Sequence, residues 1–429
     1  MTGGERSVFR VGLVLLVFFV ISLLTNVVGP LVPDIIRSFR LSLVMVAFLP
    51  FAFFIAYGVM SIPAGMLVDR FGEKPILVGA FAAASCGALL FALVPRYPTA
   101  ILSLFVIGCG MAALQVAINP LLRLAGGEEH FAFYSVLGQL FFGAASFLSP
   151  IVYSVFVRTI GTPAGERNPL LRTLGRLVPP DLAWISIYWV LAAVTLVMTL
   201  LLSLTRLPGV RKKEDEKTGN WAAYGSLLRR KAVILYFLGI VAYVGTEQGI
   251  ANWISQFLSV YHHYDPRIVG AKAVSGFWGL MTIGCVLGLV LLKFIDSRKI
   301  LVAFSAAAVI LLSVGLFGPG PAALWAFPLT GFAASVMWSI IFSLALNSVR
   351  SLHGSFSGIL CTGIIGGALV PLIIGGLGDR FGLRQGMCFL YLTLAYVLSI
   401  GLWARPLVNN ATFAGRTKSR APAETAALG

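Results

Sequence analysis

The sequence predicts an all-α integral membrane protein with twelve transmembrane helices arranged in two halves of six. Of its 429 residues, 58% are hydrophobic and only 11% are charged, and the mean hydropathy is +0.93. A soluble domain carries about 25% charged residues, which cover its surface. Apolar runs of about 20 residues, the length that crosses a bilayer core, recur along the whole chain. These observations exclude an ordinary soluble domain and indicate that the chain is surrounded by a lipid bilayer.

Each of the twelve apolar runs is about as long as a membrane-spanning helix. Short stretches that hold nearly all of the charged residues separate the runs. The first six spans are predicted over residues 11–31, 43–68, 76–94, 99–122, 133–157 and 183–204. The last six are predicted over residues 232–260, 273–292, 300–317, 322–346, 356–377 and 386–403.

A polar and basic segment, residues 206–231, divides these spans into two groups of six. It contains Arg-Lys-Lys-Glu-Asp-Glu-Lys at 211–217 and Arg-Arg-Lys at 229–231. We therefore expect six-helix bundles over residues 1–205 and 232–405, joined by a cytoplasmic linker. Residues 406–429 are expected to form a disordered cytoplasmic tail.

The distribution of Lys and Arg predicts the orientation of the chain. If the N-terminus lies inside, the inside segments hold 21 of the 32 basic residues and the outside segments hold 11. Short cytoplasmic loops carry such an excess, so we expect a multi-pass protein of the plasma (inner) membrane with both termini cytoplasmic. In the outside loop at 158–182, four leucines at helical spacing predict a short helix on the membrane surface. They are Leu170, Leu171, Leu174 and Leu177.

One eight-residue pattern occurs twice. Residues 65–72 read Gly-Met-Leu-Val-Asp-Arg-Phe-Gly, and residues 375–382 read Gly-Gly-Leu-Gly-Asp-Arg-Phe-Gly. The first follows the second span and the second follows the eleventh, so the predicted topology puts them on opposite faces. Nested three-helix repeats of inverted topology would produce this placement.

Six plus six spans with a basic central loop is the architecture of the major facilitator superfamily. Gly65, Asp69, Arg70, Gly72 and Lys74 also have the spacing of that superfamily's loop signature between its second and third helices. The resemblance implies a major facilitator fold. It also implies that these loop residues form a gating loop that stabilises one of two access states.

Shorter motifs are similar to the fucose–galactose–glucose:proton symporter family. They lie in order at residues 61–65, 113–120, 137–139, 149–150, 243–247, 277–284 and 366–371. Four positions depart from the pattern of the family's prototype. Its acidic residues are replaced by Gly29 and Gln115, an Asn by Phe142, and a common Arg by Cys285. The prototype's own proton-coupling mechanism therefore does not carry over.

Amide and indole side chains in the spans are the predicted substrate contacts. An amide offers both hydrogen-bond donors and acceptors, as a sugar requires, and an aromatic ring can stack on a sugar. Gln115 and Asn119 share a face of the fourth span, and Gln248 and Asn252 share one of the seventh. The alternative is that such amides bond neighbouring helices. The predicted substrate-binding residues are Asn26, Gln115, Asn119, Gln139, Gln248, Asn252, Trp253 and Trp278.

Glu247 is the one acidic residue near the middle of a predicted span. A carboxylate is costly there unless it faces a cavity or a partner. It has three interpretations: a proton carrier, a fixed ligand for a substrate hydroxyl or sodium, or a structural residue paired with a donor on another helix. Gly245 and Gly249 are expected to loosen the helix around it. Asp34 is a second acid, which we expect at the membrane interface.

The sequence thus predicts a secondary transporter of a sugar or a similar small polar solute, working by alternating access with proton coupling. The alternatives are a facilitative sugar uniporter, or an exporter or importer of another organic solute. A membrane sensor or embedded enzyme is disfavoured because we find no catalytic constellation, and no phosphate-cradling motif indicates ATP-driven transport. His262, His263 and Asp265 are expected in a solvated loop rather than a metal site. We expect a monomer without cofactor, metal or nucleic-acid partner, with protons or sodium as the possible coupling ions.

Overall fold

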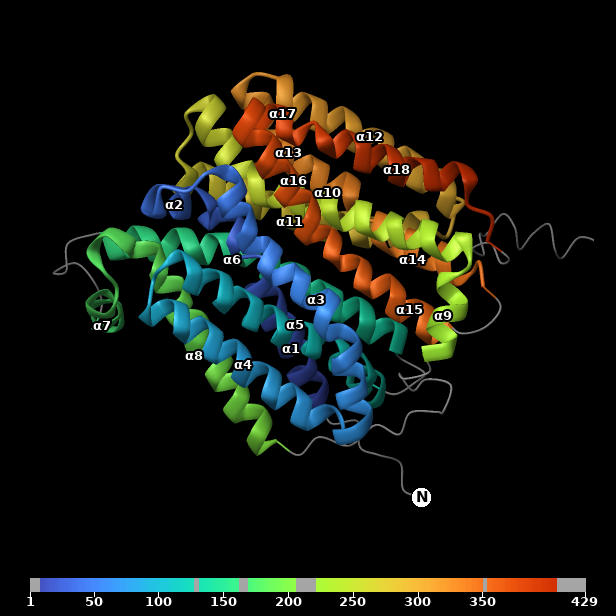
Figure 1. Cartoon of the computed structure of the whole chain (residues 1–429), viewed down its shortest axis with the longest axis horizontal. Coiled ribbons are helices and arrows are strands. Elements are labelled where there is room, and N and C mark those ends of the chain that lie inside the picture. Colours follow the sequence, from blue (N-terminus) through green and yellow to red (C-terminus); the bar gives the residue numbers. More distant parts are fainter. Residues whose placement is uncertain (1–7, 127–130, 162–168, 206–220, 350–352, 407–429) are drawn as a thin grey trace, which may run out of the picture.

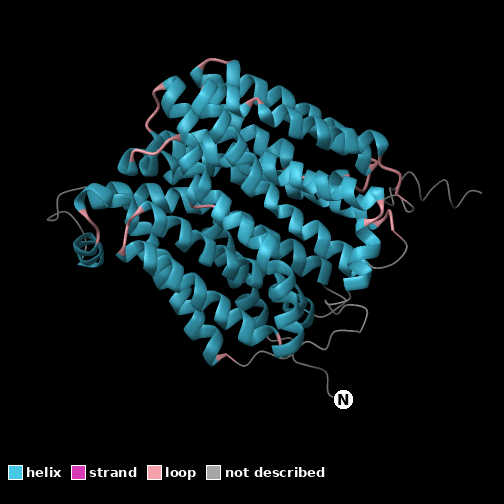
Figure 2. Ribbon diagram, in the orientation of Figure 1, coloured by secondary structure: helices cyan, strands magenta, loops and turns pink. Residues whose placement is uncertain are grey.

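The computed structural model describes residues 8–126, 131–161, 169–205, 221–349 and 353–406. Within these residues the chain is helical, with short connecting loops (Figure 2). Twelve stretches are helical, long and apolar enough to cross a membrane, which confirms the predicted number. The first of them extends over Phe9–Phe39, beyond the predicted end at residue 31. The expected tail over residues 406–429 lies almost entirely outside the described residues.

Nine helices make up the part of the chain before the linker, which lies in the lower part of Figure 1. They are α1 (Val8–Thr25), α2 (Val28–Phe39), α3 (Leu43–Phe71), α4 (Glu73–Leu93), α5 (Tyr97–Gly126), α6 (Phe131–Gly161), α7 (Pro169–Leu177), η3 (Pro180–Ile185) and α8 (Ser186–Leu204). Helix α7 contains the four leucines for which a short helix was predicted. We call α1 to α8 the N-half.

The rest of the chain forms the upper part of the molecule in Figure 1, which we call the C-half. The short helix α9 (Trp221–Leu228) lies within the predicted linker and precedes α10 (Lys231–His262). The remaining helices are η5 (Pro266–Gly270), α11 (Ala271–Leu291), α12 (Ser297–Phe317), α13 (Gly320–Ala334), α14 (Met337–Leu346), α15 (His353–Thr362), η6 (Gly363–Ile365), α16 (Gly366–Phe381), α17 (Leu383–Met387) and α18 (Phe389–Trp403).

Three spans are interrupted rather than continuous. The first breaks at Asn26 and Val27, between α1 and α2. Pro30 follows in the first turn of α2, and its ring, which lacks a backbone N–H, cannot bond the carbonyl of Asn26. The tenth span breaks at Ser335 and Val336, and the eleventh tightens into η6. Interrupted helices free backbone groups, and transporter sites form where such groups line a cavity.

The seventh span, α10, is one uninterrupted helix, so the expected loosening at its glycines is wrong. Gly245 and Gly249 instead permit close packing against the C-half. A Cβ atom on Gly245 would collide with Val370 of α16, and one on Gly249 would lie 2.8 Å from Leu390 of α18. These glycines therefore hold α10 against its neighbours instead of bending it.

The halves pack through α2 against α10, α3 against α16, and α6 against α11. At Gly29 the backbones of α2 and α10 meet, because a Cβ there would lie only 2.7 Å from the carbonyl oxygen of Ala251. We call the end of the bundle that carries α2 and α17 the α2 end and the opposite end, with α9, the α9 end (Figure 1).

Candidate functional site

Glu247 lies in the middle of α10 and is half-buried. It accepts a hydrogen bond of 2.6 Å from the hydroxyl of Tyr243 and one of 3.0 Å from the amide nitrogen of Gln248. Both donors belong to α10 itself, so the predicted pairing with a donor on another helix is not what the structure shows. Among the described residues Glu247 makes no ion pair. A carboxylate held by neutral donors alone can take up and release a proton without breaking a salt bridge.

An aromatic wall stands beside this carboxylate. The ring of Tyr243 lies 6.2 Å from that of Trp338 of α14, and Trp338 stacks on Phe342 at 5.8 Å. Trp338 and Phe342 are partly exposed, whereas Tyr243 is buried. An apolar face next to a hydrogen-bonding group suits a ring that carries both C–H faces and hydroxyls.

The thiol of Cys285, on α11, donates to the carbonyl of Ser335 at 3.2 Å. Along α11 it shares a face with Trp278, Met281 and Gly288, which are buried, while Cys285 is exposed. Leu289, one turn further along the helix, is exposed as well, so the thiol lies on an accessible stretch of α11.

Asn26, just before α2, and two neighbouring residues of α10 have buried polar atoms without partners in the described part of the chain. Asn26 donates from its amide nitrogen to Ser146 at 2.9 Å, but its amide oxygen has no partner among the described residues. The amide nitrogen of Asn252 and the indole nitrogen of Trp253 also have none. These three side chains are at most 5% exposed. A buried polar atom left unpaired costs about 1–3 kcal/mol, so such atoms mark places where a water or ligand completes the site.

The structure brings three predicted residues close to Glu247 and α2. Gln248 bonds Glu247, its Cγ lies beside Gly367 of α16, and Asn252 follows one turn along α10. The Cα of Asn252 would lie 3.5 Å from a Cβ on Gly29, three residues after Asn26. Asn26, Gln248 and Asn252 therefore lie at the junction of the two halves.

The remaining predicted substrate contacts are not shown to lie near Glu247 or α2. Trp253 is packed in the core with 1% exposure, and Trp278 is buried edge-to-face against Phe277. Gln139 is exposed and Gln115 is half-buried on α5. The side chain of Asn119 lies outside the described residues.

The predicted gating loop lies between α3 and α4, at the end of α3 away from α2. Gly72 ends α3 with a φ of +83°, a conformation that favours glycine, and Arg70 lies over the ring of Phe71. Gly65 is buried within α3, and the Asp69 side chain lies outside the described residues. Gly382 ends α16 with a φ of +93°, so both copies of the repeated pattern end a helix in the same way.

Asp34, which we expected at the membrane interface, is buried within the protein near the α2 end. Its side chain is 2% exposed and accepts three hydrogen bonds of 2.9–3.1 Å from Arg267 of η5, together with one from the hydroxyl of Tyr153 of α6. The first span continues eight residues past its predicted end, which places Asp34 inside it. Sequence reasoning missed Arg267 and Tyr153. The signal was the acid itself, because a carboxylate inside a span needs a partner.

Comparison with known proteins places the chain among membrane transporters. The family model described as Major Facilitator Superfamily matches residues 14–371. The glucose/galactose transporter of Brucella abortus is 31% identical over 396 residues, which is 90% of this chain and 92% of that protein. The L-fucose-proton symporter of Escherichia coli is 25% identical over 418 residues, with the same two shares.

A solved structure shares the fold. The inward-facing, unoccupied structure of a bacterial homologue of the human lysosomal transporter Spinster has a TM-score of 0.77 and 17% identity. The match covers 94% of this chain and 98% of that one.

Proposed function

The chain belongs to the major facilitator superfamily, and on that premise we propose that it moves a sugar across the membrane by alternating access, coupled to protons. It is a multi-pass membrane protein, and three of its predicted contacts, Asn26, Gln248 and Asn252, lie at the junction of two helical halves. The observation that carries the proposal is Glu247, a half-buried acidic residue in mid-span whose carboxylate is bonded by neutral donors on its own helix. The proposed role of Glu247 is proton carrier.

The unpartnered atoms near α2 support a substrate with many hydroxyl groups. The Asn26 oxygen can accept a hydrogen bond, and the Asn252 and Trp253 nitrogens can donate. A sugar hydroxyl does both, and the partly exposed Trp338 offers it an aromatic face. The relatives named above as glucose/galactose transporter and L-fucose-proton symporter support the same substrate class.

The proposed orientation puts the α2 end outside the cell and the α9 end in the cytoplasm, as the excess of basic residues in the inside segments favours. In this orientation Arg267 and Asp34 close the outer end. The proposed state of the structure is therefore one that opens toward the cytoplasm.

Facilitated diffusion is the second candidate function. It is favoured by Gly29 and Gln115, which stand where the resembled family's prototype carries acids, so that Glu247 is left as the single mid-span carboxylate. A uniporter would use Glu247 only as an acceptor for a sugar hydroxyl.

A substrate screen in proteoliposomes tests the proposal. Hexoses, deoxyhexoses, amino sugars and a non-sugar solute are offered with no gradient, with a pH gradient and with a sodium gradient. Accumulation of a sugar driven by the pH gradient is the expected result. Sodium-driven accumulation would change the coupling ion, equilibration without accumulation would support the uniporter, and uptake of the non-sugar solute alone would refute the sugar proposal.

A further inference from the structure

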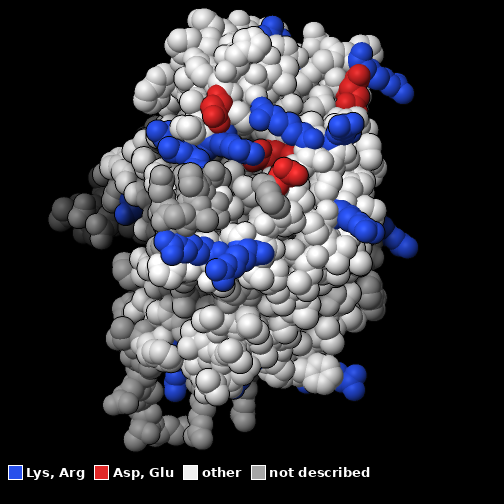
Figure 3. All heavy atoms as spheres, turned by 90° about the vertical axis from the view of Figure 1, so that its left-hand side faces the viewer, with Lys and Arg blue, Asp and Glu red and all other residues white. Residues whose placement is uncertain are grey.

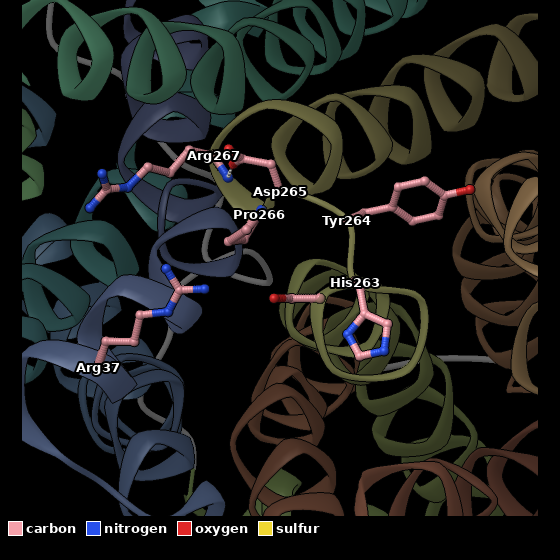
Figure 4. A pocket seen from close by; sticks show the side chains of 7 residues that line it. Arg37, His263, Tyr264, Asp265, Pro266 and Arg267 are labelled. Carbon is pink, nitrogen blue, oxygen red and sulfur yellow. Dashed lines mark hydrogen bonds between the residues drawn. The ribbon is translucent and has the colours of Figure 1, made fainter.

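The α2 end carries charged contacts between the halves that neither substrate binding nor proton carriage uses. Figure 3 looks onto this end and shows acidic side chains lying beside basic ones near its middle. A pit of about 440 Å³ opens there between the halves (Figure 4). Arg37 of α2 lines one side. The other side is formed by the C-half, through Ser259 and the five residues His263–Arg267.

The first contact is the cluster of Asp34, Arg267 and Tyr153. Arg267 approaches Asp34 with its Nε and one terminal nitrogen at 2.9–3.1 Å, so the pair is bidentate and crosses between the halves. Asp34 is buried, while the Arg267 side chain remains 42% exposed. A buried carboxylate that loses its partner is strongly destabilised unless water reaches it. Separation of α2 from η5 must therefore hydrate Asp34 or leave its charge uncompensated.

Tyr153 makes the cluster asymmetric. It belongs to the N-half, as Asp34 does, and its hydroxyl donates to the Asp34 carboxylate. When the halves separate, Arg267 leaves with the C-half, but Tyr153 stays with Asp34. The tyrosine thus keeps the carboxylate oriented toward the position to which Arg267 returns.

The second contact lies at the first turn of α3. The Asp379 carboxylate of α16 accepts hydrogen bonds from the backbone nitrogens of Leu43 and Val44 at 2.7 and 2.9 Å. These are amide groups that a helix start leaves unpaired, and an anion there is favoured by the helix dipole. The backbone nitrogen of Met45 donates instead to the hydroxyl of Ser42, which belongs to the same half. Two of the backbone N–H groups at the start of α3 therefore depend on the C-half for their hydrogen-bond acceptor.

We infer that Asp34, Arg267 and Asp379 are gating residues of the transport cycle, forming a two-part latch that holds the α2 end shut, with Tyr153 positioning Asp34 for reclosure. The latch breaks each time the α2 end opens, and its strength sets how often this end is open in the absence of substrate. The inference rests on the proposed alternating access, but it does not depend on which solute or ion is carried.

Cys285 provides the readout, because it is exposed on α11, a C-half helix that packs against α6 of the N-half. In a variant that keeps Cys285 as its single cysteine, a membrane-impermeant maleimide reaches it from the α2 side only while the latch is open. Right-side-out and inside-out vesicles are labelled in parallel without substrate. A marker variant, Lys272→Cys at an exposed position near the α2 end, identifies which vesicles present that side.

Arg267→Gln is the main test. It removes the positive charge from a partly exposed side chain, so it leaves no cavity in the core. We expect it, and Asp34→Asn, to raise α2-side labelling of Cys285 about tenfold, within the usual range of conformational coupling. Arg37→Gln is the matched control on the same pit, since Arg37 makes no ion pair within the described part of the chain, and its labelling rate should stay at the parent value. The exchanged pair, Asp34→Arg with Arg267→Asp, should return the rate toward the parent.

Tyr153→Phe tests whether the Tyr153 hydroxyl positions the Asp34 carboxylate or the Tyr153 ring only packs against its neighbours. It keeps the ring and the ion pair, so the closed state persists, but reclosure slows and labelling rises by a smaller factor than in Arg267→Gln. Unchanged labelling in Arg267→Gln would overturn the latch, as would an equal rise in Arg37→Gln. Since the assay contains no sugar and no gradient, its failure is distinguishable from a failure of the transport proposal.

Discussion

Replacing the Glu247 carboxylate by an amide should uncouple sugar movement from the proton. In Glu247→Gln the side chain keeps its shape, and its amide oxygen can still accept the 2.6 Å hydrogen bond from Tyr243. The change therefore costs about 1 kcal/mol of local hydrogen bonding while removing the group that titrates. A structural role would show as loss of folding, and a coupling role as loss of accumulation alone.

The size of the effect follows from one titrating carboxylate. Moving one charge through 100 mV is worth about 2.3 kcal/mol, so a one-proton symporter can hold a gradient of a neutral sugar of about 50-fold. The wild-type protein should approach this ratio in proteoliposomes with an imposed inside-negative potential. Glu247→Gln should fall to a ratio of about 1, set by equilibration without coupling.

Two further measurements make the test decisive. Exchange of labelled for unlabelled sugar, which needs no net proton movement, should stay within about threefold of wild type in Glu247→Gln. Asp296→Asn, which removes a carboxylate from the start of α12 far from the site, should accumulate normally. Wild-type accumulation in Glu247→Gln would refute the reasoning and assign the proton to another group.

Three other outcomes are expected. Asn252→Ala removes a buried amide nitrogen that has no partner, so sugar affinity should fall about tenfold in equilibrium binding with little change in thermal stability. Ser305→Ala, at another unpartnered buried atom, is the control, and equal losses in both would deny Asn252 a substrate contact. Gly29→Val places atoms against the Ala251 carbonyl and forces α2 away from α10. The α2-side labelling of Cys285 should therefore rise, and the transport rate should fall at least tenfold. Unchanged labelling would show that α2 and α10 separate at no cost. Asp379→Asn weakens the contact at the start of α3, so it should raise the same labelling by a few-fold and add to Arg267→Gln; a loss of substrate selectivity instead would contradict a gating role.

The number of spans and the family could be predicted because both depend on patterns that are local in sequence. Apolar runs of bilayer length are visible without knowing what packs against them, and the loop signature around Gly65 and Gly72 is contiguous. The bend expected at Gly245 failed for the opposite reason. Whether a helical glycine bends a helix or admits a neighbour depends on Val370, which is 125 positions away.

The site was predicted in part. Glu247, Gln248 and Asn252 were found because an acid or an amide in a hydrophobic run is conspicuous. Tyr243 carries no such signal, since aromatic residues are ordinary in apolar spans. The partners of Asp34 could not be predicted, because α2 continues through Pro33 and buries the carboxylate against residues far away in the sequence.

The contact at Gly29 has a consequence for the ion gradient of the cell. Backbone meets backbone there, since a Cβ on Gly29 would lie 2.7 Å from the Ala251 oxygen, so no water molecule fits between α2 and α10 at this position. Protons cross proteins along files of water molecules, and such a file beside Glu247 would let them slip through without a sugar. With the proposed proton coupling, the smallest side chain at this position closes one route by which the stored proton gradient would discharge through an idle transporter.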